Sequence, residues 1–353
     1  MSIKDEFRDE NETLAKADII KVRRERDVAA KELARARDEL EAANRALSIV
    51  SSVEASDLEP PKWMTPGKPK PSAATLLLML SDTHFDEVVN PDEVEGLNAY
   101  NREIAVMRLH KWATNTVNVA RHYLAGVTYD GVVLMLGGDI FSGDIHEELA
   151  QTNEDTMISS VLFWSEQVAA AVEVLASEFG KVHVPVVVGN HGRMSRKPRM
   201  KLRAKTNFDW LLGKMVEKHF TGDKRVTFDI PEGTDALVSI YGHGHLLSHG
   251  DQVSGGGGIG GIYPPIMRMR ARKAQRYLTT GQSFETLWIG HWHQYLPSPH
   301  LVVNGSLKGY DEYAFINNFQ MEPPQQALAV VTPKHNITFH APIFSADRKA
   351  EKW

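Results

Sequence analysis

The 353-residue chain contains no cysteine, which excludes disulfide bonds and thiolate metal sites. It also lacks an unbroken apolar run long enough to cross a bilayer, because its strongest run, Leu76–Leu80, is far shorter than the ~20 residues needed. The N-terminus is charged and lacks the apolar core of a signal peptide. From these absences we expect a cytoplasmic protein that has no membrane partner.

An excess of positive charge is missing as well. Lys and Arg number 40 against 45 Asp and Glu, a formal net charge of -5, so any polyanion must be held by a local basic patch. Hydrophobic residues at 42% and charged residues at 24% match an ordinary globular protein. Histidine is plentiful at 15, so a metal site here would use imidazole, carboxylate and amide ligands.

Residues 1–52 contain neither glycine nor proline and are rich in strong helix formers, which predicts one charged helix. A heptad fits this segment from Ile19 onward, with a positions at Ile19, Arg26, Leu33, Leu40 and Leu47 and d positions at Val22, Ala29, Ala36, Ala43 and Val50. The pattern favours a coiled coil and a homo-oligomer, and a lone helix docked on its own domain is the alternative. Residues 53–73 hold five prolines and predict a semi-rigid linker, after which residues 74–353 are expected to form the main domain.

Strand and helix patterns alternate in residues 74–353, which predicts an α/β layered fold. Short apolar runs typical of strands buried on both faces occur at Leu76–Leu80, Val132–Leu136, Val182–Val188, Ala236–Tyr241, Leu287–Ile289 and Leu301–Val303. Helices are expected near 101–124, 156–179 and 207–219, and further strands at Ala327–Val331 and Ile337–Ile343.

Metal-competent side chains follow the ends of five of these strands. They are Asp82 and His84, then Asp139, then Asn190 with His191, then His249, and last His291 with His293. Because the carboxyl ends of strands in open α/β sheets form the binding crevice, these residues should converge. A carboxylate can bridge two cations while imidazole and amide groups complete the shells, and such a pair can clamp a phosphoryl group.

In this order the motifs Asp-X-His, Gly-Gly-Asp, Gly-Asn-His, His-Gly and Gly-His-X-His resemble those of the calcineurin-like metallophosphoesterase superfamily, over residues 75 to about 310. The resemblance implies a two-sheet β-sandwich flanked by helices. It implies one metal held by Asp82, His84 and His293, with Asp139 bridging, and a second held by Asn190, His249 and His291. It also implies that His191 protonates the leaving oxygen.

Two positions depart from the superfamily pattern. Gly192 and Arg193 follow the Asn-His motif where an acid is frequent, and Ser142 stands where protein phosphatases carry an acid that supports the catalytic histidine. Orientation of His191 must then come from elsewhere. Protein phosphatase activity is disfavoured, and the stretch 137–141 is closer to the nuclease branch, the DNA repair exonucleases.

His243 and His245 also match Gly-His-X-His. Taking them as the last motif would leave only His219 as the preceding ligand, and His219 lies in an amphipathic helical stretch. The order of motifs therefore assigns the metal to His249. His243 and His245 are then expected either to support the metal ligands without binding the metal or to be ordinary strand residues.

Two basic runs follow active-site motifs in this acidic chain. The candidate substrate residues in them are Arg193, Arg196, Lys197, Arg199, Arg268 and Arg270. Basic residues beside a phosphoesterase centre favour a polyanion, with nucleic acid the commonest, whereas the alternative is a solvated helix face.

The leading hypothesis is a nuclease that uses two divalent cations, with Mn²⁺ favoured over Fe, Zn, Ni or Mg, and acts on DNA or RNA. One alternative is a phosphodiesterase for small, including cyclic, nucleotides or a phosphomonoesterase. An alternative from another class is a coiled-coil scaffold that binds nucleic acid and keeps the centre as a structural metal site.

Overall fold

The computed structural model describes residues 61–65, 73–253 and 261–352, and six helical, exposed residues of the N-terminal segment: Arg26, Ala30, Lys31, Leu33, Ala34 and Arg37. The predicted coiled coil and most of the predicted linker lie outside the described residues. The chain divides into two compact units, one of Met1–Asp57 with Ala274–Ser283 and one of Leu58–Lys273 with Phe284–Trp353. The second unit contains every strand described below.

One short part of the predicted linker is packed on the second unit. Residues Lys62–Met64 form a 3-10 turn (η1), and the Met64 side chain is 0% exposed. The Tyr241 backbone N–H donates a 2.6 Å hydrogen bond to the Met64 carbonyl. Proline spacing did not reveal this contact, because it depends on a strand far along the chain.

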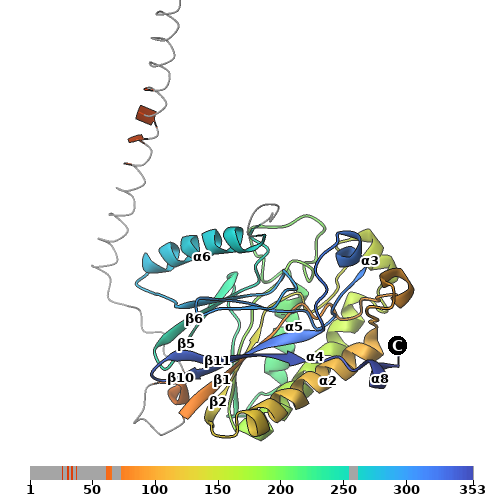
Figure 1. The fold of residues 1–353 in the computed structure, drawn as a ribbon, viewed down its shortest axis with the longest axis horizontal. Helices are drawn as coiled ribbons and strands as arrows, with labels where there is room; N and C mark the ends of the chain where they lie inside the picture. The colour runs from red at the N-terminus through yellow and green to blue at the C-terminus, as the bar shows by residue number, and fades with distance from the viewer. Residues whose placement is uncertain are drawn as a thin grey trace, which may run out of the picture. The chain divides into compact units, whose positions relative to one another are not determined.

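The first sheet has six strands in the order β11-β10-β1-β2-β3-β4 (Figure 1). Their bounds are β1 Ala73–Leu80, β2 Thr128–Leu136, β3 Val182–Pro185, β4 Val226–Asp229, β10 Gln325–Thr332 and β11 Asn336–Phe344. Strands β1, β2, β3 and β4 run parallel to one another, whereas β10 pairs antiparallel with both β1 and β11. The parallel strands therefore end at the same edge of the sheet.

The second sheet has five strands in the order β5-β6-β7-β9-β8. Their bounds are β5 Asp235–Ile240, β6 His243–Ser248, β7 Thr286–Ile289, β8 Leu296–Pro297 and β9 Leu301–Val303. Strands β6, β7 and β9 are parallel, so the loops that follow them also share one edge.

The helices connect and cover these sheets. Their bounds are η2 Pro91–Val94, α2 Arg102–Asn118, the π-helical turn η3 Val119–Tyr123, α3 Glu147–Thr152, α4 Met157–Phe179, α5 Phe208–His219, α6 Tyr263–Leu278, α7 Glu312–Ile316 and α8 Arg348–Glu351. Local sequence sets the ends of the long ones. The Asn101 side chain caps α2 by accepting a 2.8 Å bond from the Ile104 N–H, and α4 stops at Gly180, whose φ of 78° ends the helix.

The alternating side chains of β1 divide the interior into two cores. Leu76, Leu78 and Leu80 pack in a cluster with Trp112 of α2 and Trp164 of α4. The intervening side chains pack instead against the second sheet, in a cluster that joins Leu77 and Met79 to Ile240, Trp288 and Val302. Because both faces of β1 are covered, its sequence is an unbroken apolar run.

The predicted α/β architecture with two sheets and flanking helices is confirmed. Its boundaries differ in places: the strand expected over Val182–Val188 is regular only to Pro185, where proline lacks the N–H that a ladder needs. Strand β4 was not predicted, because its exposed and half-buried positions dilute the apolar signal.

Within the described part of the chain, α4 has the length and hydropathy of a membrane-crossing helix. Polar residues such as Ser165 and Glu166 interrupt its sequence, so it contains no unbroken apolar run. Its Trp164, Val168 and Leu175 side chains are 0% exposed in the sheet-facing core, which is the pattern of a core helix. A cytoplasmic location stays a prediction.

Candidate metal centre

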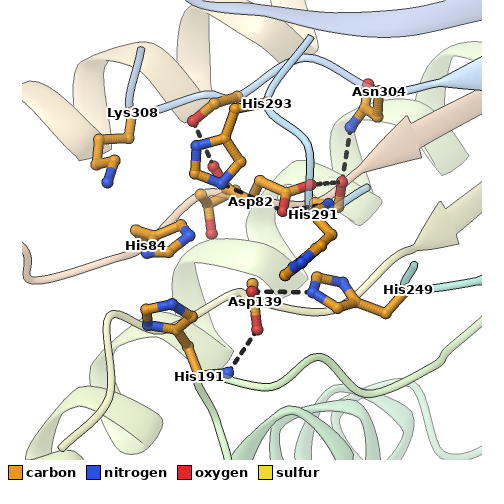
Figure 2. Close-up of polar contacts among 12 residues, drawn as sticks. Asp82, His84, Asp139, His191, His249, His291, His293, Asn304 and Lys308 are labelled. Carbon is orange, nitrogen blue, oxygen red and sulfur yellow. Dashed lines mark hydrogen bonds and ion pairs between the residues drawn. The ribbon is translucent and has the colours of Figure 1, made fainter. Parts of the chain in front are cut away.

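The predicted metal ligands and His191 follow the ends of strands from both sheets. Figure 2 shows one common space that is faced by the side chains of Asp82, His84, Asp139, His191, His249, His291 and His293. Backbone hydrogen bonds fasten the first two loops together, because the Asp82 N–H donates to the Gly138 carbonyl (3.1 Å) and the His84 N–H donates to the Asp139 carbonyl (3.2 Å). The loops after β6, β7 and β9 bring His249, His291 and Asn304 to the same place.

The backbone at this site is strained at five of the predicted residues. Asp82, His84, Asp139, His291 and His293 have φ values of 52°, 44°, 50°, 70° and 52°, in the left-handed region that residues with a Cβ avoid. Strain of this kind persists only where surrounding contacts over-determine the chain, and it gathers at functional sites.

Asp82, His84 and His293 form the first metal-competent group. One ligand atom of each lies within 4.8 Å of the others, and His293 Nε2 is 3.5 Å from Asp82 Oδ1. Burial, with the charge of Lys308 and the neighbouring His191, lowers the pKa of His84 to about 4, so the ring is neutral at pH 7. Its Nε2 atom is buried without a hydrogen-bond partner, which leaves a lone pair available to a cation.

Asp139, His249 and His291 form a second group within the same distance limit. His249 Nδ1 lies 2.9 Å from the Gly137 carbonyl and therefore carries the hydrogen. Its Nε2 atom lies 2.9 Å from Asp139 Oδ2 and 3.2 Å from Asn190 Oδ1. Burial alone would lower the pKa of His249, but the Asp139 carboxylate raises it to about 10. Three electron-rich atoms thus face one point that requires a proton or a metal cation.

Asp139 belongs to a third group as well, with His84 and His191, so it lies between the other two sets. The His84 and His191 ring centroids are 4.5 Å apart. His191 Nδ1 lies 2.8 Å from the Ser142 backbone carbonyl, which only accepts, so Nδ1 donates and Nε2 is the atom left for a substrate. A backbone carbonyl of residue 142 thus orients His191, as the absence of an acid side chain there required.

Asp209, at the first turn of α5, was not predicted. Its buried carboxylate accepts hydrogen bonds from the backbone N–H groups of Asp139 (3.1 Å), Ile140 (3.2 Å) and Gly189 (2.9 Å). Burial and the Asp139 charge raise the pKa of Asp209 to about 6. The side chain joins the loops after β2 and β3, and no spacing along the chain signals that role.

A buried polar network on the other side of the site was also missed. Glu87 Oε2 lies 3.1 Å from His84 Nδ1, without the alignment of a hydrogen bond, and Glu87 Oε1 lies 2.7 Å from Lys308 Nζ. Lys308 also pairs with Asp311. A second chain runs from Asn304 Nδ2 to Ser81 Oγ (2.9 Å), and Ser81 donates to Asp82 Oδ2.

The candidate substrate residues lie in two places. Arg193 is tied to its own loop by bonds to the carbonyls of Asn190, Ser195 and Arg196, at 3.1, 3.0 and 2.9 Å. Arg270 on α6 donates to the carbonyls of His300 and Glu285. The remaining members of the set are exposed: Arg196, Lys197, Arg199 and Arg268.

His243 and His245 are strand residues of β6 outside the three groups. His243 Nδ1 lies 2.9 Å from Glu285 Oε1. His245 is buried next to Trp288, whose Nε1–H donates a 3.3 Å bond to His245 Nδ1. Burial lowers the pKa of His245 to about 3, so the ring is neutral.

No model of a known protein family matches the chain, and no curated protein sequence matches it either. Among solved structures it is similar to the sulfate thiohydrolase SoxB of Thermus thermophilus in complex with glycerol, at 12% identity and a TM-score of 0.32. The match covers 79% of this chain and 58% of SoxB, so the chain spans less than two thirds of that protein. At this level of similarity, function has to be inferred from the chain's own side chains.

Proposed function

We propose that the chain is a metal-dependent phosphoester hydrolase of the calcineurin-like metallophosphoesterase superfamily. Two metal-competent groups carry the proposal, one of Asp82, His84 and His293 and one of Asp139, His249 and His291. Both are built from the superfamily's motifs in the superfamily's order. The donor set fits divalent cations, since it combines neutral imidazole, carboxylate and amide oxygen without thiolate.

The proposed metal ligands are the residues of the two groups together with Asn190. Asp82, His84 and His293 would hold one cation, and Asn190, His249 and His291 the other. Asp139 would contribute to both. Bound cations would supply Lewis-acid stabilisation of a phosphoryl group and lower the pKa of water.

His191 is proposed to donate the proton that the leaving oxygen needs. The Ser142 carbonyl holds Nδ1, so Nε2 faces the shared space beside His84 and Asp139. When the ring is protonated, Nε2–H can pass its proton to the ester oxygen as the bond to phosphorus breaks.

The direct experiment compares two chromogenic substrates. Protein stripped with EDTA and reloaded with Mn²⁺, Fe²⁺, Zn²⁺, Ni²⁺ or Mg²⁺ is offered bis(p-nitrophenyl) phosphate and p-nitrophenyl phosphate. We expect Mn²⁺-dependent turnover with a preference for the diester. Monoester preference would indicate a phosphomonoesterase. No turnover with any metal would favour the alternative of a nucleic-acid-binding scaffold in which the metal site is structural.

Nucleic acid is proposed as the polymeric substrate on the strength of the exposed basic residues after His191. Each phosphate neutralised by Lys or Arg releases counterions, so oligonucleotide binding should weaken steeply with salt. Replacing Arg196, Lys197, Arg199 and Lys201 with Ala should raise the KM for an end-labelled oligonucleotide and flatten its salt dependence. If the KM and the salt slope stay at wild-type values, the nuclease hypothesis gives way to the small-nucleotide alternative.

A further inference from the structure

A cavity of about 520 Å³ lies directly over the candidate metal centre. Its floor consists of residues already assigned to the centre: His84, Asp139, Asn190, His191, His291 and His293. The rest of its lining comes from Glu87, from Trp292 and Gln294, and from two segments that the proposed chemistry does not use, within residues 146–149 and 306–323. A group attached to a phosphoryl group at the centre can therefore enter this space.

Aromatic side chains line the part of the cavity that residues 306–323 form. Tyr310, Tyr313 and Phe319 line the cavity there, and Trp292 lines it from the loop after β7. The Tyr313 and Phe319 rings meet edge to face at 5.7 Å, yet these side chains are 67% and 48% exposed. Exposed aromatic rings at the mouth of a cavity offer apolar area that a bound ring can cover.

The charges around the cavity disfavour additional phosphates. Carboxylates of Glu87, Glu148, Asp311 and Glu322 line it. Among the described residues, the one Lys or Arg in its lining is Lys308, whose Nζ is already paired with Glu87 at 2.7 Å and with Asp311. An anionic group placed beyond the centre would therefore meet carboxylates without a free cation to offset them.

We infer that this cavity binds the ester group of the substrate as an uncharged aromatic ring system, of the nucleobase or aryl kind, stacked against Tyr313 and Phe319. The inference rests on the proposed function, because the centre must hold the phosphoryl group that carries the ring. It makes the segment 306–323 a determinant of specificity. A polymeric substrate would then contact the basic loop after His191 outside this cavity.

The test measures binding without turnover. Phenylphosphonate and methylphosphonate carry the same acid group on an unbreakable carbon–phosphorus bond, so both offer the same group to the metals. Isothermal titration calorimetry on the full chain loaded with Mn²⁺ should show phenylphosphonate binding roughly tenfold tighter, within the range for stacking one ring on aromatic side chains. Phe319→Ala and Tyr313→Ala should each reduce that ratio by several-fold, and Tyr313→Phe, which keeps the ring, should preserve it.

The matched control is Tyr123→Ala, which removes an aromatic side chain of similar exposure (77%) at the end of η3. It should leave the ratio unchanged. Equal binding of the two phosphonates by the wild type would overturn the inference, as would wild-type selectivity in both alanine variants. A change in oligomeric mass in those variants without a change in selectivity would assign the rim to contacts between copies, and would also overturn it.

Failure of the proposed function gives a different pattern. In that case no ester is hydrolysed with any metal, although phenyl selectivity persists in the binding assay. Turnover of bis(p-nitrophenyl) phosphate together with absent phenyl selectivity would retain the enzyme and remove the aromatic site.

Discussion

A buried ion pair between Arg108 and Glu351 connects α2 to α8, and it gives the most quantitative prediction. Arg108 on α2 is 0% exposed and pairs with Glu351 of α8 at 2.9 Å. The same guanidinium donates to the carbonyls of Lys308 (2.5 Å) and Ala99 (3.1 Å) and to Asn98 Oδ1 (3.0 Å). One side chain thus fixes the base of the segment that lines the cavity.

Removing Arg108 takes away the cation that pairs with the buried Glu351 carboxylate. Arg108→Ala should therefore lower the free energy of unfolding by about 3–5 kcal/mol, a large part of the ~5–15 kcal/mol that a domain has. Arg121→Ala is the matched control. Arg121 pairs with Glu178 at 2.5 Å, but the two side chains are 42% and 36% exposed, so its loss should cost at most about 1 kcal/mol.

Urea unfolding followed by tryptophan fluorescence measures both variants on one scale. Arg108→Ala should also lower kcat/KM, since the carbonyl of Lys308 loses a donor and the cavity wall can shift. Glu351→Gln should lie between the two arginine variants, because the neutral amide keeps a hydrogen-bond acceptor for Arg108. If the midpoints of Arg108→Ala and Arg121→Ala agreed within error, the argument from burial would be refuted.

Three further predictions concern the centre and assembly. Asp139→Asn removes the charge shared by both groups and should abolish turnover with the fold intact by circular dichroism; wild-type activity at saturating Mn²⁺ would contradict the two-metal assignment. His191→Ala should lose ~10²–10⁴ in rate on esters with poor leaving groups and much less on p-nitrophenyl esters, whereas equal losses would remove His191 from the acid role. Deleting residues 1–52 should reduce the mass seen by light scattering and spare turnover of a small diester, and an unchanged mass would place the interface in the catalytic domain.

The buried strands could be predicted because their sequences carry the signal themselves. Leu76–Leu80 is covered by helices on one face and by a sheet on the other, so every position is apolar. The residues that follow such strands gather at one edge for topological reasons, which is why Asp82, Asp139 and His291 could be placed together from the sequence. His249 follows β6, whose residues lie outside the predicted apolar runs. Short edge elements such as β4 lack that signal.

The supporting residues could not be predicted, because their partners are set by tertiary contacts. Lys308 is 221 residues from Glu87, and Arg108 is 243 residues from Glu351. Asp209 acts through three backbone N–H groups, which every sequence has and none distinguishes. The sequence shows that Ser142 stands where an acid is expected. It could not show that the backbone carbonyl of Ser142 orients His191, because every residue has such a carbonyl.

The carboxylates at the centre are held by the same loops that they help to fix. Asp82 Oδ1 accepts a 2.8 Å bond from the His291 N–H, and Asp139 Oδ1 accepts a 2.7 Å bond from the His191 N–H. Each bond joins the loop after one strand to the loop after another, and Asp209 adds a further tie between β2 and β3. The strained backbone at Asp82, Asp139 and His291 is thus supported by hydrogen bonds within the chain. The loops of this site are ordered by the fold before a cation binds. The affinity for a cation would therefore depend on the geometry of its ligands and not on folding coupled to binding.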